Sequence, residues 1–77
     1  MDRDVELDGA LLANVGPNWV KAAMVVARIL NQFPGEDDSY LGRRLELLSE
    51  RGLVEAQGDL SNLRHSEVRL PQGNGDA

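Results

Sequence analysis

Apolar residues recur at helical spacing in three stretches of the chain, and capping or breaking residues bound each stretch. We predict helices over residues 5–14, 19–32 and 39–51. The expected N-caps are Asp4, Asn18 and one of the pair Asp37 and Asp38. Helix-stopping residues follow each stretch: Gly16-Pro17, Pro34-Gly35 and Gly52.

The second predicted helix is apolar over most of its circumference. Its strongest apolar stripe consists of Trp19, Ala23, Val26, Leu30 and Phe33. The polar strip is narrow and consists of Lys21, Arg28 and Gln32. We expect this helix to be largely buried, with Met24 and Val25 beside the polar strip, either half-covered by other elements or exposed as a contact patch.

Two short alternating runs, residues 53–57 and 66–70, follow the third helix and predict a β-hairpin with its turn at residues 60–64. One register would place Glu55 opposite Glu67, where like charges repel. We therefore predict the register that places Glu55 opposite Arg69.

Three helices followed by a two-stranded β-hairpin, the wing, predict an α+β domain with a winged-helix-like fold. We expect this single domain to span residues 1–71. Residues 72–77 are polar and rich in glycine, which predicts a disordered tail.

Size and composition narrow the class of protein. A chain of 77 residues makes one small domain, and the absence of cysteine excludes disulfides and thiolate metal sites. Packing, or a partner subunit, must therefore supply the stability. The acidic N-terminus does not resemble a signal peptide, and no apolar stretch approaches the length of a membrane span. We expect a soluble cytoplasmic protein that does not enter a membrane.

The C-terminal half carries a recognisable pattern, L-S-E-R-G-L-V-E-A-Q-G-D-L over residues 48–60 and R-H-S-E-V-R-L over residues 64–70. Together with the segment around Trp19 and residues 38–44, it resembles a bacterial domain family of unknown function. The resemblance spans about residues 7–71. It implies no activity, cofactor or catalytic residue.

Candidate catalytic and metal groups are few. The only histidine, His65, has Ser66 beside it and Asp59 across the predicted hairpin, but neighbouring strand residues point to opposite faces. We therefore interpret His65 as a surface residue paired with Asp59. The carboxylates of residues 36–38 lack the alternating ligands of a calcium loop and are sufficiently explained by helix capping. We predict no catalytic residue, no metal and no cofactor.

The charge pattern opposes nucleic-acid binding, which the fold would otherwise favour. The formal net charge is −5, and the exposed face of the third helix would offer Arg43 beside Glu46 and Glu50. Binding through Arg43 and Arg64 is thus the alternative hypothesis. Arg44 lies near the apolar side of this helix, and an ion pair with Asp38 or Glu67 is its first interpretation, ahead of phosphate binding.

Protein interaction is the function that these patterns favour. The apolar excess of the second helix, in a short chain without covalent cross-links, predicts a protein partner or self-association. The partner-surface candidates are Lys21, Met24, Val25 and Arg28.

Overall fold

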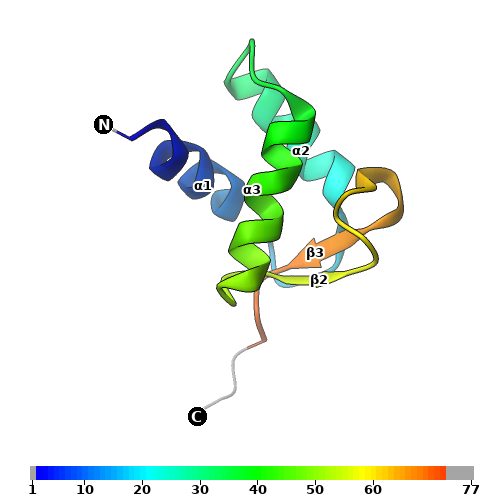
Figure 1. The fold of residues 1–77 in the computed structure, drawn as a ribbon. Coiled ribbons are helices and arrows are strands. Elements are labelled where there is room, and N and C mark those ends of the chain that lie inside the picture. Colours follow the sequence, from blue (N-terminus) through cyan, green and yellow to red (C-terminus); the bar gives the residue numbers. More distant parts are fainter. Residues whose placement is uncertain (1, 73–77) are drawn as a thin grey trace.

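The computed structural model describes residues 2–72, which form an α+β fold of three helices and a three-stranded antiparallel sheet (Figure 1). The elements are, in chain order, α1 (Arg3–Ala13), β1 (Val20–Lys21), α2 (Ala22–Gln32), α3 (Asp38–Glu50), β2 (Glu55–Gln57), the short 3-10 helix η1 (Leu63–His65) and β3 (Glu67–Arg69). This arrangement is compatible with a winged-helix-like fold, but it has three strands where the sequence predicted a two-stranded hairpin.

The sheet has the strand order β1-β3-β2, so the last strand is central. Glu55 lies opposite Arg69 and Ala56 opposite Val68, which confirms the predicted register. Arg69 Nε donates to Glu55 Oε1 at 2.7 Å, and its guanidinium lies 4.4 Å from the centre of the Trp19 ring.

The strand that the sequence did not predict is β1, and its residues were expected to begin the second helix. Val20 pairs with Val68, so α2 begins at Ala22 and not at residue 19. Backbone hydrogen bonds hold the segment in place: Ala22 N donates to Ser66 O at 3.0 Å, and Leu70 N donates to Gly16 O at 2.8 Å. From helical propensity alone, Val20 and Lys21 would belong to the first turn of a helix. Pairing with β3 gives their backbone N–H and C=O groups hydrogen-bond partners in the sheet instead.

Carboxylate caps begin two of the helices. Asp37 Oδ1 accepts from Ser39 N at 3.0 Å, which confirms one of the two caps expected for α3. The first helix begins earlier than predicted, because Asp2 Oδ1 and not Asp4 caps it, accepting from the Asp4 amide at 3.0 Å. Gly52 follows α3 with φ at 79°, the left-handed conformation expected of a glycine after a helix.

All three helices and the sheet contribute to one core. Its members are Leu7, Leu11, Val15, Ala22, Val25, Val26, Ile29, Leu41, Leu45, Leu48, Val54, Leu60 and Val68. The buried face of α2 differs from the predicted stripe, since Ala22, Val25 and Ile29 are fully buried whereas Leu30 and Phe33 are only partly covered. A helix that is apolar on nearly every side gives no periodicity with which to orient it.

The chain termini fall largely outside this description. Of the predicted disordered tail, residues 73–77 lie outside the described residues. Gln72 is described, and its side-chain amide donates to the Pro17 carbonyl at 3.0 Å.

Candidate interaction surface

The segment between β2 and β3 folds back onto the helices. Gly58 begins the return with φ at 82°, and a Cβ at this position would lie 2.5 Å from the His65 carbonyl oxygen. Leu60 is buried in the core, and the buried Ser66 Oγ donates to Asn62 O at 3.0 Å. The turn that was predicted at residues 60–64 is therefore a packed structure and includes η1.

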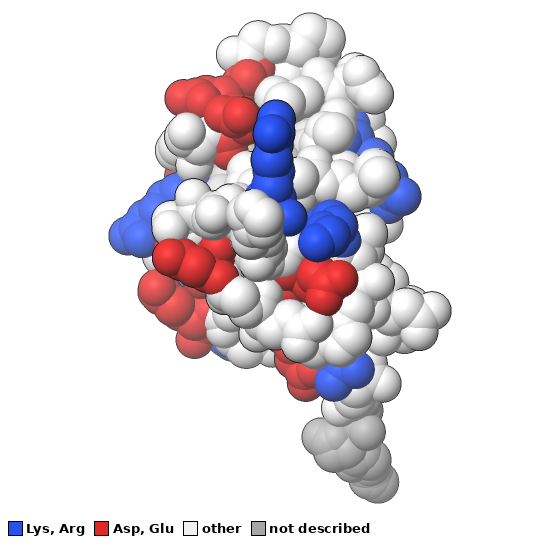
Figure 2. All heavy atoms as spheres, turned by 90° about the vertical axis from the view of Figure 1, so that its right-hand side faces the viewer, with Lys and Arg blue, Asp and Glu red and all other residues white. Residues whose placement is uncertain are grey.

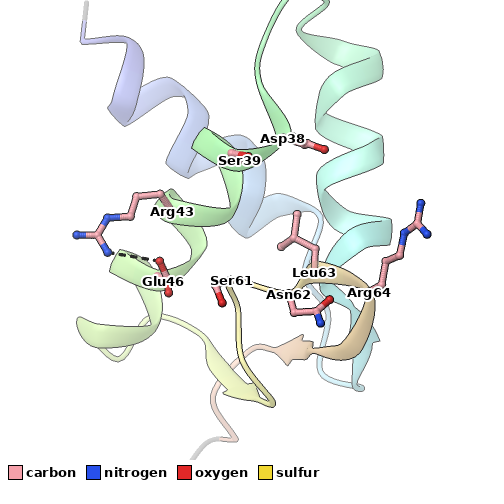
Figure 3. Close-up of a pocket in the computed structure, with 8 residues that line it drawn as sticks. All are labelled: Asp38, Ser39, Arg43, Glu46, Ser61, Asn62, Leu63 and Arg64. Atoms are coloured by element: carbon pink, nitrogen blue, oxygen red, sulfur yellow. Dashed lines mark hydrogen bonds and ion pairs between the residues drawn. The ribbon is translucent and has the colours of Figure 1, made fainter.

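Gly42 in α3 provides the place against which this segment packs. A Cβ on Gly42 would lie 3.3 Å from Leu63 Cδ2, so the missing side chain lets Leu63 approach the helix backbone. Figure 3 shows Leu63 rising from the loop between α3 and α2, with Arg64 directed to the far side beside α2. The return of the loop thus carries Arg64 to the surface of α2.

A polar hollow of about 540 Å³ lies between α3 and this loop. Its lining residues are Asp38, Ser39, Arg43, Glu46, Ser61, Asn62, Leu63 and Arg64. Arg43 Nη1 lies 3.4 Å from Glu46 Oε1, so one of the two cations that line the hollow is already paired with a carboxylate (Figure 3). The lining mixes both signs of charge and does not select one sign of ligand.

A smaller hollow of about 230 Å³ is also bordered by Leu63. It is lined mainly by apolar α2 residues, and its full lining is Ala23, Val26, Ala27, Leu30, Asp38, Leu63 and Arg64. Leu63 and Arg64 border both hollows. We call the second one the apolar hollow.

One of the basic side chains without an ion pair, Arg64, lines the apolar hollow. Four of the eight Lys and Arg residues make no ion pair with the described residues: Lys21, Arg28, Arg51 and Arg64. Lys21 Nζ lies 3.5 Å from the Arg64 carbonyl oxygen, and Arg28 lies in α2, seven residues after Lys21. Figure 2 shows several basic side chains near one another on this side of the molecule, with acidic side chains beside them.

We define the α2–η1 face by Lys21, Met24, Arg28 and Arg64. All four residues are exposed, and half of the Met24 surface, 50%, is accessible to solvent. Of the residues predicted for a partner surface, Lys21, Met24 and Arg28 are exposed, and their role stays a prediction. The prediction is wrong at Val25, which is fully buried because the Ala22–Val25–Ile29 side of α2 faces the core.

The two arginines proposed for nucleic-acid binding have different surroundings. Both border the polar hollow, but Arg43 is paired with Glu46 whereas Arg64 belongs to the α2–η1 face. Sequence reasoning missed Leu63, Ala23 and Ala27 as parts of a surface. The only sequence signals for them are Gly42 and Gly58, whose roles depend on the folded path of the loop.

Arg44 joins α1 to α3 through an ion pair with two hydrogen bonds. Its Nε and Nη2 atoms donate to the two carboxylate oxygens of Asp8 at 3.0 and 2.7 Å, and Asp4 Oδ2 lies 3.5 Å from Nη1. The predicted partners, Asp38 and Glu67, are wrong because α1, not the hairpin, packs against this side of α3. The hydrogen bond to Asp8 raises the pKa of Arg44, so the guanidinium stays charged.

Two more carboxylates near α1, Glu36 and Asp4, accept hydrogen bonds from side chains of the same domain. Arg3 donates to Glu36 Oε2 at 2.9 and 2.6 Å, and the Tyr40 hydroxyl donates to Asp4. The hydrogen bond to Asp4 raises the pKa of Tyr40. Several carboxylates of α1 and the α2–α3 loop are thus engaged within the domain.

The residues considered for catalysis, Asp59 and Ser66, each form hydrogen bonds with other groups of the loop and not with one another. Asp59 Oδ1 accepts from the amide and hydroxyl of Ser61 at 2.9 and 2.7 Å, so the predicted pairing with His65 is wrong. These hydrogen bonds lower the pKa of Asp59. Ser66 Oγ is bonded to a backbone carbonyl. Among residues 2–72, no three His, Asp or Glu side chains come together in a way that could hold a metal ion.

Comparison of the chain with family models, characterised proteins and solved structures gives no match. The resemblance to a bacterial domain family therefore stays a prediction. Within the described part of the chain, no helix has the length and apolar character needed to cross a membrane.

Proposed function

We propose that this chain is a non-catalytic protein-interaction or regulatory module of winged-helix-like fold, acting in the cytoplasm, and that its α2–η1 face receives the partner. The observation that carries the proposal is the combination of three exposed cations, one of which lines an apolar hollow, with a half-exposed methionine. In a chain with a net charge of −5, these cations have no ion-pair partner among residues 2–72.

The energetics of this face favour a partner. Like charges held close together repel one another, and a carboxylate of a bound protein relieves that repulsion. The apolar side chains of the hollow gain from removal of water in the same event. Glu67 lies across the sheet from Lys21, but its carboxylate accepts a hydrogen bond from Gln57 Nε2.

Nucleic-acid binding is the second candidate, favoured by the winged-helix-like element order and by Arg64. In such folds the third helix enters the major groove. Here α3 carries the exposed Glu50 and Arg43, which pairs with the partly buried Glu46, and Asp37 and Asp38 stand at its N-terminal end. Repulsion between these carboxylates and phosphates supports the protein partner instead.

Site-specific photo-crosslinking in the native host cell tests the proposed function. A benzoylphenylalanine replaces Met24 in one variant and Leu53 in the control, since these side chains have similar exposure, 50% and 46%. We expect a discrete protein adduct from position 24 and none from position 53. No adduct at 24, or the same adducts at both positions, contradicts a partner on the α2–η1 face.

A further inference from the structure

We propose that the occupant of the α2–η1 face is an acidic helical segment of a different protein, and not a second copy of this chain. The inference rests on the proposed function and names the chemistry of its partner. The carboxylates of the partner helix would pair with Lys21, Arg28 and Arg64. One apolar side chain of that helix would enter the apolar hollow beside Leu63.

The positions of the cations define the spacing of the carboxylates. Lys21 is the last residue of β1 and immediately precedes α2, and Arg28 lies within α2 seven residues later, so their backbones are about 10 Å apart along the axis of α2. Carboxylates two turns apart on a partner helix have the same separation. Met24 stands between the two cations, so the matching partner position, one turn from each carboxylate, is apolar.

The third cation adds a lateral contact. Arg64 comes from η1 and lines the apolar hollow together with Ala23 and Ala27 of α2. Because alanine side chains are short, a larger apolar side chain of the partner fits against them and against Leu63. The face thus combines exposed cations from β1, α2 and η1 with an apolar hollow, which complements an amphipathic acidic helix.

A second copy is a poor occupant. In a twofold dimer the same patch meets itself, so cations would face cations. A head-to-tail contact would need free carboxylates elsewhere on the chain, and the two exposed carboxylates of α3 without an ion pair among the described residues, Asp38 and Glu50, stand at opposite ends of that helix, about 18 Å apart. On the α1 side, Asp8 is held by Arg44, Glu36 by Arg3 and Asp4 by Tyr40.

Nucleic acid fits this face less well than an acidic helix. A phosphate backbone follows continuous positive charge, whereas Asp38 borders both hollows and Glu67 lies opposite Lys21. The apolar floor of the hollow gives a charged backbone nothing to contact.

Fluorescence anisotropy with defined probes tests the inference on the purified protein. The probe is a labelled helical peptide of about 15 residues, with glutamates two turns apart and leucines between them. The matched probe replaces each glutamate by glutamine. We expect the acidic peptide to bind about tenfold more tightly than the glutamine peptide, with the difference reduced at high salt.

Three charge reversals identify the face. Arg28→Glu and Arg64→Glu should each weaken binding of the acidic peptide by about tenfold. Arg51→Glu is the control, because Arg51 is also exposed and makes no ion pair with the described residues. It should change binding by less than about twofold.

Four results overturn the inference: equal binding of the two peptides, equal loss in all three variants, tighter binding of duplex DNA of similar length than of the acidic peptide, or a dimer by light scattering that Arg28→Glu dissociates. If the crosslink at position 24 is present while the acidic peptide does not bind, the acidic chemistry is wrong and the proposed function stands. Loss of the crosslink contradicts the proposed function itself.

Discussion

Removing Arg44 should destabilise the fold far more than removing its neighbour Arg43. Only 12% of the Arg44 side chain and 14% of the Asp8 side chain are exposed, and two hydrogen bonds join them. Arg44→Met preserves most of the apolar stem but leaves the Asp8 carboxylate without its partner. Arg43→Met removes an exposed ion pair with Glu46 from the same helix and is the matched control.

The expected cost follows from burial. Breaking a fully buried pair costs about 3–5 kcal/mol, whereas an exposed pair contributes at most about 1 kcal/mol. The Arg44 pair is near the buried limit but touches solvent, so we expect Arg44→Met to lower the free energy of unfolding by about 3 kcal/mol. For a domain of this size that corresponds to a fall of about 15 °C in the melting temperature. Arg43→Met should change the free energy of unfolding by about 0.5 kcal/mol or less.

Urea and thermal unfolding followed by Trp19 fluorescence measure these changes, because the chain has a single tryptophan. The double variant Asp8→Ala/Arg44→Met completes a mutant cycle with the single Asp8→Ala variant. We expect the double variant to be more stable than the sum of the two single costs predicts, by about 1.5 kcal/mol or more. Equal costs for Arg44→Met and Arg43→Met would refute the importance of the α1–α3 ion pair.

Other parts of the fold make separate predictions. Gly58→Ala should lower the free energy of unfolding by about 2 kcal/mol or more, because a Cβ would meet a backbone carbonyl at 2.5 Å at a φ of +82°. Gly9→Ala, in open space within α1, should raise the free energy of unfolding by about 0.5–1 kcal/mol. If urea unfolding shows that both glycine variants stabilise, or that both destabilise, the protein, these two predictions are contradicted. The single tyrosine, Tyr40, should ionise above the ordinary pKa of 10.0 in an ultraviolet titration, and Asp4→Asn should bring the midpoint back toward that value. The neutral form of Tyr40 stabilises the fold below pH 10, and this contribution is lost as the pH rises through the folded-state pKa. The Asp59 carboxyl should titrate below its ordinary pKa of 3.8 in an NMR titration, so its stabilising contribution is present above that pH and is lost as the pH falls through the lowered pKa; a midpoint at or above 3.8 would contradict the hydrogen bonds to Ser61.

Local signals predicted the parts of the fold that local contacts decide. The third helix lies between an aspartate cap and a glycine stop, and both act as expected. The hairpin register follows from the attraction of Glu55 for Arg69 and the repulsion of Glu55 from Glu67, so it could be read from the charges alone.

Long-range packing decided what the sequence could not predict. Val20 and Lys21 belong to an apolar segment that fits a helix, and only pairing with β3 makes them a strand. The orientation of α2 depends on where the other helices pack, because almost every side of it is apolar. Val25 was for this reason placed at the surface when it belongs to the core.

The candidate site follows the same division. Helical spacing grouped Lys21 with Arg28 in the sequence, but only Arg28 belongs to α2, because Lys21 pairs with Glu67 in the sheet. Arg64 joins them only because Gly58 turns the chain back and Gly42 makes room for Leu63. Similarly, the partner of Arg44 is on α1, more than thirty residues away in the chain, and the relative placement of α1 and α3 decides that pair.

Amide chemical-shift mapping tests most directly whether the α2–η1 face is the binding surface. Unlabelled acidic helical peptide is added to the ¹⁵N-labelled protein, and the shifts of all assigned backbone amides are followed. We predict that the largest changes lie in residues 21–30 and 62–65. Changes confined to residues 39–50, along the exposed side of α3, would contradict the account and favour the winged-helix mode of nucleic-acid binding.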